Sequence, residues 1–114
     1  MGASSTFLVT KGCTPEENAA SIVKLFKDGR QPDITIECSG AESSICTGIY
    51  VTRSGGVLVL VGLGPAKIEI PIVNAAVREV DIRGIFRYTF AYLHSGKNYH
   101  FLAHKSNLDL VMRK

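Results

Sequence analysis

The sequence lacks a long apolar run, a secretory signal and any paired-cysteine motif, and each absence excludes a class of protein. No run of about 20 apolar residues occurs, so we expect no membrane-spanning segment. The start, MGASSTFLV, has neither the basic region nor the apolar stretch of a secretory signal, and we expect a cytoplasmic protein. The three cysteines have no CxxC or zinc-ribbon spacing, so we expect reduced thiols packed as small apolar side chains. They are Cys13, Cys38 and Cys46.

Charge is unevenly spread. Residues 1–88 hold nine Lys/Arg and nine Asp/Glu, whereas residues 89–114 hold four Lys/Arg, one acid and all three histidines. This shift predicts one domain over residues 1–88 and a basic tail over residues 89–114. The tail has no dense Lys/Arg cluster, so we expect no nucleic-acid partner. His100 and His104 have the i, i+4 spacing of a helical metal site, but no third ligand accompanies them, which favours solvated histidines.

The clearest element is a helix that begins after Thr14. Thr14, Pro15 and Glu17 supply an N-cap, a first-turn proline and a capping box. We expect this helix to end at Gly29. Periodicity and composition also predict strands over residues 6–10, 32–38, 57–62 and 81–88, and helices over residues 41–53 and 73–80.

Two segments have weaker patterns. Residues 67–73 alternate between polar and apolar but contain Pro71, which fits an edge strand or an irregular link. The apolar residues of the tail keep no single period. We therefore expect the tail to be the least ordered part, with at most a weak helix near residues 107–113.

The alternation of strands and helices predicts an α/β fold. Right-handed crossovers would give a mostly parallel sheet with helices on both faces. Ligands of such sheets bind beyond the carboxyl ends of the strands. The loops at residues 38–41, 61–66 and 86–89 are therefore the candidate binding loops.

Gly62 and Gly64 follow a predicted strand, as the glycines of a dinucleotide-binding loop do. The third position of that G-x-G-x-x-G/A pattern is Lys67 here, and the residues after it alternate without a helical stripe. A pyrophosphate loop needs a helix N-terminus directly after the glycines. We therefore interpret this segment as a tight strand-end turn in which the backbone approaches a neighbour closely.

Two stretches, ITIECSGAESSICTGIYVTRSGGVLVLVGLG and IPIVNAAVREVDIRGIFRY, closely resemble the nucleotide-binding domain of zinc-dependent sorbitol (L-iditol) dehydrogenases. That family is part of the medium-chain dehydrogenase superfamily, and the resemblance covers about residues 2–88. It implies a partial Rossmann fold, doubly wound and mostly parallel, that lacks its first half. It also implies NAD as cofactor, and a parent reaction that oxidises a polyol to a ketose with zinc. The residues after Tyr88 diverge from the family.

The resemblance also implies binding residues. Cys38, Ser39 and Gly40 match a turn near the adenosine half of NAD. Arg87 and Tyr88 match the pair that faces the polyol, and the guanidinium of Arg87 offers a planar donor fork. The residues that match the surroundings of the nicotinamide are Val61, Gly62, Leu63, Ile85, Phe86 and Arg87.

Other parts of the family pattern are missing. The pyrophosphate loop, the ribose-binding acid, the zinc ligands and the proton-handling residues match nothing here, so we assign no catalytic residue and no metal site. Glu37 and Glu42 fit a strand-end and a helix-start carboxylate better than acid/base residues. We expect the chain alone to be inactive and to bind NAD weakly or not at all. The alternative is a non-catalytic fragment that pairs with full-length subunits, as a homo-oligomer does, through the sheet edge around KIEIPI.

Overall fold

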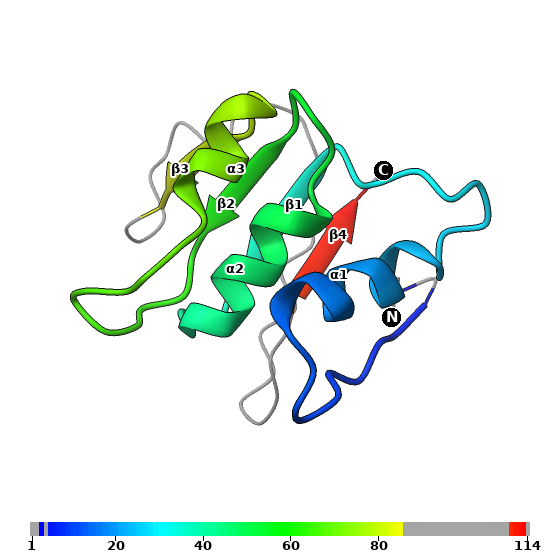
Figure 1. Ribbon diagram of the computed structural model, residues 1–114, viewed down its shortest axis with the longest axis horizontal. Helices are drawn as coiled ribbons and strands as arrows, with labels where there is room; N and C mark the ends of the chain where they lie inside the picture. Colours follow the sequence, from blue (N-terminus) through cyan, green and yellow to red (C-terminus); the bar gives the residue numbers. More distant parts are fainter. Residues whose placement is uncertain (1–2, 4, 86–109, 114) are drawn as a thin grey trace.

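The computed structural model describes residues 3, 5–85 and 110–113. In this part of the chain, helices and strands combine in a mixed α/β fold (Figure 1). Three strands alternate with helices, and one further strand lies near the end of the chain. The elements are α1 (Pro15–Val23), β1 (Ile34–Glu37), α2 (Glu42–Val51), β2 (Val57–Leu60), α3 (Ile72–Val77), β3 (Asp81–Gly84) and β4 (Leu110–Arg113).

The sheet has the order β3-β2-β1-β4. β1 pairs with β2 and β2 pairs with β3 in parallel, with Ile34 opposite Val57 and Val57 opposite Asp81. Helices α2 and α3 form the two crossovers and lie over the same face of the sheet (Figure 1). The predicted α/β class and mostly parallel sheet are confirmed. The expected helices on both faces are not found for the two crossovers, because α2 and α3 share one face.

Helix α1 begins where the capping residues predicted. Thr14 Oγ1 accepts from the backbone N–H of Glu17 at 3.2 Å, and the Glu17 carboxylate accepts from the N–H of Thr14 at 2.8 Å. The helix ends at Val23, earlier than expected. Residues 24–29 continue as turns, in which Gly29 donates to the carbonyl of Phe26 and has a φ of 64°.

The predicted strand over residues 6–10 is wrong, because this segment has no regular structure. Phe7 packs against the cluster formed by Ala19, Ile22 and Val51, between α1 and α2. The adjacent Leu8 is 78% exposed. The segment thus packs with the helices and pairs with no described strand, so its β-rich composition is not enough to make a strand.

The weak helix predicted near residues 107–113 is also wrong for residues 110–113, because these residues form strand β4. It pairs antiparallel with β1 along its whole length, from Glu37 opposite Leu110 to Ile34 opposite Arg113. An unpaired strand edge offers hydrogen-bonding groups that can impose extended structure on a segment without strand periodicity. Residues 86–109, where the predicted boundary falls, lie outside the described part.

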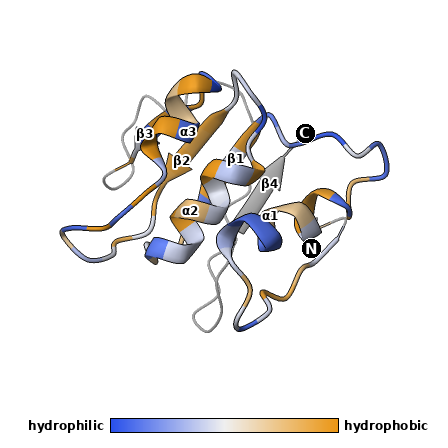
Figure 2. Cartoon of the chain, viewed as in Figure 1, coloured by the Kyte–Doolittle hydropathy of each residue, from blue (hydrophilic) through white to orange (hydrophobic). Residues whose placement is uncertain are grey.

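The main core lies between α2, the sheet and α3. Its buried members are Ile45, Ile49, Leu58, Ala75 and Val80. Figure 2 shows β2 and most of α3 as the most hydrophobic elements around it. Ile68 and Ile70 of the link before α3 pack against this cluster. The sequence left two alternatives for residues 67–71, an edge strand or an irregular link. The structure shows the irregular link.

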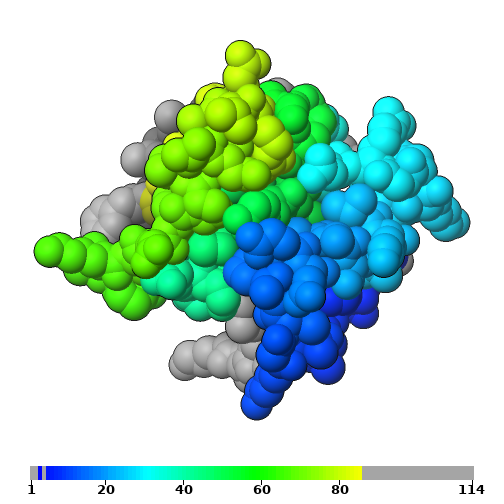
Figure 3. All heavy atoms as spheres, viewed as in Figure 1, coloured from blue at the N-terminus to red at the C-terminus, as the bar shows by residue number. Residues whose placement is uncertain are grey.

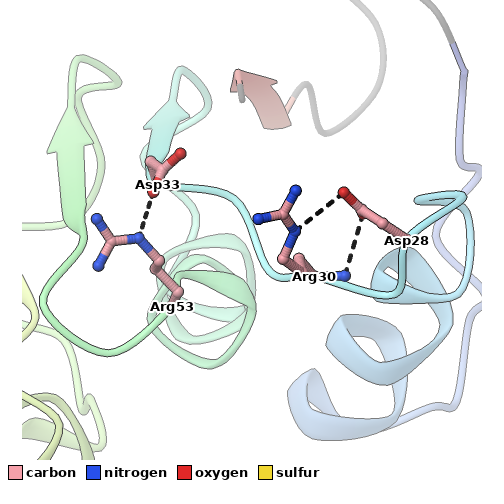
Figure 4. Close-up of polar contacts among 4 residues, drawn as sticks. All are labelled: Asp28, Arg30, Asp33 and Arg53. Carbon is pink, nitrogen blue, oxygen red and sulfur yellow. Dashed lines mark hydrogen bonds and ion pairs between the residues drawn. The ribbon is translucent and has the colours of Figure 1, made fainter.

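Polar contacts stabilise the loop before β1 and the carboxyl end of α2. Arg53, just after α2, forms an ion pair with Asp33 at the entrance to β1, and Arg30 pairs with Asp28 at 3.1 Å (Figure 4). Both pairs are solvent-exposed, so each contributes little to stability. Arg78 is better placed, because it donates to the carbonyls of Ile49 and Thr52 at the carboxyl end of α2. It therefore ties the end of α2 to the residues that follow α3.

Candidate functional site at the carboxyl edge of the sheet

The loops after the three parallel strands meet at one edge. The N–H groups of Val61 and Gly62 donate to the carbonyl of Glu37 at 2.8 and 3.1 Å, and the N–H of Ile85 donates to Leu60 at 2.9 Å. The structure thus brings together the predicted residues Val61, Gly62 and Ile85. Of the other predicted residues, Leu63 follows directly, whereas Phe86, Arg87 and Tyr88 lie outside the described residues.

Three glycines pack against one another between the first two loops. A Cβ on Gly62 would overlap the backbone nitrogen of Gly40, and a Cβ on Gly64 would overlap its carbonyl oxygen. A Cβ on Gly40 would lie 2.5 Å from the nitrogen of Gly64, and Gly40 itself has a φ of +74°. The close backbone approach inferred from the sequence is therefore an approach of the loop after β2 to the loop after β1.

Glu37, at the end of β1, holds the loop that follows this strand. Its side chain is fully buried, and its carboxylate accepts from the N–H and hydroxyl of Ser39 and from the N–H of Gly40. The sequence correctly indicated a strand-end carboxylate, but it did not reveal this anchoring. The spacing E-x-S-G was the available signal, since a carboxylate reaches N–H groups two or three residues ahead.

The exposed surface of this edge is apolar. Leu63 is 82% exposed and begins a segment that projects from the body of the molecule (Figures 1 and 3), while Val61 and Ile85 are half-buried beside it. The N–H groups of Val61 and Gly62 are already bonded within the protein. The edge can therefore offer apolar contact to a flat ligand, and it offers no donor from these two residues.

No phosphate cradle follows β2. Residues 63–71 form no helix, and α3 begins only at Ile72. A dinucleotide phosphate is held by N–H groups at the start of a helix directly after the glycines. The interpretation of Gly62 and Gly64 as a strand-end turn is thus confirmed by the backbone.

A separate hollow of about 330 Å³ lies between the start of α1, α2 and the link before α3. The N–H of Glu69 donates to the Glu42 carboxylate at 3.0 Å, and the thiol of Cys46 donates to the carbonyl of Glu69 at 3.5 Å. These contacts join the link to α2. The hollow is lined by Pro15, Glu16, Glu42, Cys46, Tyr50, Glu69, Ile70 and Pro71.

Three groups in the hollow have shifted pKa values. A hydrogen bond from Tyr50 lowers the pKa of Glu16, and the same bond raises the pKa of Tyr50. Burial raises the pKa of the Cys46 thiol, and the negative charge of Glu42 raises it further. Cys46 is consequently a protonated, weakly nucleophilic thiol at neutral pH.

The described residues do not fit a zinc site. Within the described part of the chain, no three His, Cys, Asp or Glu side chains lie close enough together to hold a metal ion. Cys46 is buried as expected, Cys38 is half-buried, and Cys13 is exposed, which corrects the expectation that all three thiols pack inside. None of the described helices is long and apolar enough to cross a membrane.

The comparisons with known proteins agree with this architecture. The sequence model of the zinc-binding dehydrogenase family matches residues 1–100. Sorbitol dehydrogenase of Gallus gallus is 58% identical over 88 residues, which is 77% of this chain and 24% of that protein. Sorbitol dehydrogenase of Homo sapiens is 63% identical over 60 residues, 53% of this chain and 17% of that one.

A solved structure supports the fold. It is described as a zinc-binding dehydrogenase of Sinorhizobium meliloti bound to NADP, and it aligns with a TM-score of 0.53 at 24% identity. The alignment covers 67% of this chain and 24% of that chain. The described parallel strands thus form part of a Rossmann-type fold. The chain spans about a quarter of the length of the chicken relative, and it belongs to the zinc-binding dehydrogenase family.

Proposed function

We propose that this chain is the part of a polyol dehydrogenase, of the sorbitol dehydrogenase type, that contacts the nicotinamide end of NAD. Bound NAD would accept a hydride from the polyol, and the loops after β2 and β3 would hold its ring. Val61, Gly62, Leu63 and Ile85 supply the described part of this surface. Phe86 and Arg87 would extend it, and Arg87 with Tyr88 would face the polyol.

One observation carries the proposal. Sequence identity of 58% to a sorbitol dehydrogenase coincides with loops that meet at the carboxyl edge of the sheet. Ligands of doubly wound sheets bind at that edge. Leu63 is a large apolar side chain with only 18% of its surface covered, which suits contact with a planar ring better than it suits solvent.

The proposal further holds that the chain alone lacks polyol oxidation. The described residues provide neither a zinc site nor a helix that would hold the pyrophosphate. The purified chain is expected to bind NAD with a Kd above about 10 μM. It is also expected to give no turnover with sorbitol and NAD, with or without added zinc. Calorimetry and absorbance at the NADH band measure the two quantities.

A chimera tests the inherited role directly. The matched 88-residue segment of the chicken enzyme is replaced by that of this chain, and the chimera is expected to oxidise sorbitol with NAD. Leu63→Asp in the chimera should raise the KM for NAD roughly tenfold, because apolar contact is lost. The matched control is Leu8→Asp, at a leucine that is 78% exposed before α1. A folded chimera without activity, or equal KM values for both variants, would contradict the proposal.

A second candidate function rests on α3. Ile72, Val73 and Val77 are 55%, 71% and 74% exposed, an unusual concentration of apolar surface on one short helix. We propose that this surface, with the irregular link before it, associates with full-length dehydrogenase subunits. Since residues 67–71 form no strand, this association would use side-chain packing more than an extended ladder.

Gel filtration of the chain mixed with full-length sorbitol dehydrogenase tests this association. Co-elution is expected, and the double variant Val73→Asp/Val77→Asp should abolish it while Leu8→Asp leaves it intact. Separate elution of the unmodified chain at micromolar concentrations would contradict the proposed association with dehydrogenase subunits. It would not affect the proposed contact with NAD.

A further inference from the structure

The outer edge of β1 is occupied in an unusual way. Strands β1, β2 and β3 are consecutive parallel neighbours, as are the last three strands of a doubly wound sheet with the order 3-2-1-4-5-6. In that order the strand beside the first of these three is also parallel. Here the place is taken by β4, which runs antiparallel and comes from the other end of the chain.

The edge that β4 covers would otherwise invite pairing. β1 is an apolar, largely buried strand: Thr35, Ile36 and Glu37 are buried and Ile34 is half-buried. All four of its residues have a partner in β4. An uncovered strand of this kind is a template for a strand of another chain.

The segment between β3 and β4 is long enough for β4 to pair with β1 of its own chain, but its length does not require this pairing. β3 and β4 are at opposite edges of the sheet, three strand spacings or about 14 Å apart. The 24 residues numbered 86–109 span up to about 80 Å when extended. They can therefore deliver β4 to its own sheet or to a neighbour's, and at low concentration the intramolecular choice is favoured because the effective concentration is about millimolar.

We propose that the outer edge of β1 is a strand-accepting surface and that β4 is its removable cap. When β4 is in place, the chain does not pair through this edge. When β4 is displaced, the edge accepts the same strand from a second copy of the chain. This inference rests on the sheet topology and on the length of the segment that joins β3 to β4.

Two neighbouring proline substitutions test the cap. In an edge strand, alternate N–H groups point toward the neighbouring strand and toward solvent, so only one of Val111 and Met112 can donate to β1. Proline at the outward position is tolerated, and proline at the inward position removes a ladder bond. Val111→Pro and Met112→Pro are therefore each other's control.

One variant is expected to resemble the unmodified chain. The other should lose protection of the β1 amides that face β4, while the β1 amides that face β2 and the amides of β2 stay protected. It should also bind a labelled synthetic peptide of residues 107–114 (NLDLVMRK) about tenfold more tightly than the unmodified chain does. It should also shift toward dimers in light scattering as its concentration rises. If both variants match the unmodified chain in exchange, peptide binding and mass, the cap is overturned.

A cross-link keeps the test decisive if the inward proline unfolds the chain. Ile36 and Val111 are opposite each other, and opposed residues of an antiparallel pair have Cβ atoms close enough for a disulfide. Ile36→Cys/Val111→Cys should form this bond within one chain and abolish binding of the peptide, whereas Ile36→Cys alone should not. If the bond forms neither within one chain nor between two chains, β4 does not pair with β1 and the proposal is overturned.

Discussion

At the scale of single residues, Glu37 shows that one buried carboxyl group can organise a loop. Its carboxylate is the common acceptor for the N–H groups of Ser39 and Gly40. Glu37→Ala would leave these donors without a partner, and we expect the free energy of unfolding to fall by about 2–4 kcal/mol. Urea denaturation measures the change. Glu69→Ala, at an exposed side chain, is the control and should change it by less than about 0.5 kcal/mol.

The contact between Gly64 and Gly40 gives a second prediction at this scale. Gly64→Ala places a methyl group on the carbonyl of Gly40, so the loops must separate. We expect a loss of about 1–3 kcal/mol, as for other overpacked sites. At Gly84 nothing lies within 4 Å of an added Cβ. Gly84→Ala should therefore be neutral within about 0.5 kcal/mol, and equal losses in both variants would contradict the packing argument.

At the scale of elements, the carboxyl end of α2 depends on Arg78. Its guanidinium donates to the carbonyls of Ile49 and Thr52 and, at 2.9 Å, to Asn74 Oδ1. The positive charge also complements the negative end of the helix. Arg78→Ala should lower the free energy of unfolding by about 2–3 kcal/mol, measured by thermal or chemical denaturation.

Two further substitutions distinguish geometry from charge at this position. Arg78→Lys keeps the charge but cannot form the fork, so it should recover less than half of the loss. Arg83→Ala removes an exposed ion pair with Asp81 and should cost less than about 0.5 kcal/mol. Full recovery by lysine would show that charge alone matters at the end of α2.

Elements also show what the sequence could and could not predict. The start of α1 was predictable because its capping box lies within four consecutive residues. The position of Val61 and Gly62 at the carboxyl edge followed from the order of strands and helices. The segment over residues 6–10 and strand β4 were mispredicted, because pairing at a sheet edge is decided by distant residues and local composition does not report it. The anchoring by Glu37 likewise depends on how deeply the strand end is buried.

At the scale of the whole molecule, the pair of Glu16 and Tyr50 links the start of α1 to α2 and makes stability depend on pH. The pKa of Glu16 is lowered from its ordinary 4.5, so its contribution is complete above that value and is lost as the pH falls through the lowered pKa. The pKa of Tyr50 is raised from 10.0, so its contribution is lost only as the pH rises through the raised pKa.

Tyr50→Phe is therefore expected to melt at a lower temperature than the unmodified chain at pH 7. The difference should be small, because the Glu16 side chain is solvent-exposed, and it should vanish in acid. Glu16→Gln is the control and should remove the same loss of stability in acid. Thermal melts across the acid range follow this, and a difference that persists in strong acid would show that Tyr50 contributes by packing instead.

The pairing of β1 with both β2 and β4 has a consequence for the order in which the chain folds. Ile34 is 23 positions from its partner Val57 but 79 positions from its partner Arg113. Closing the longer loop costs about 1 kcal/mol more entropy than closing the shorter one. The parallel core of β1, α2 and β2 should accordingly form first, and β4 should dock last, onto an edge that has already been built.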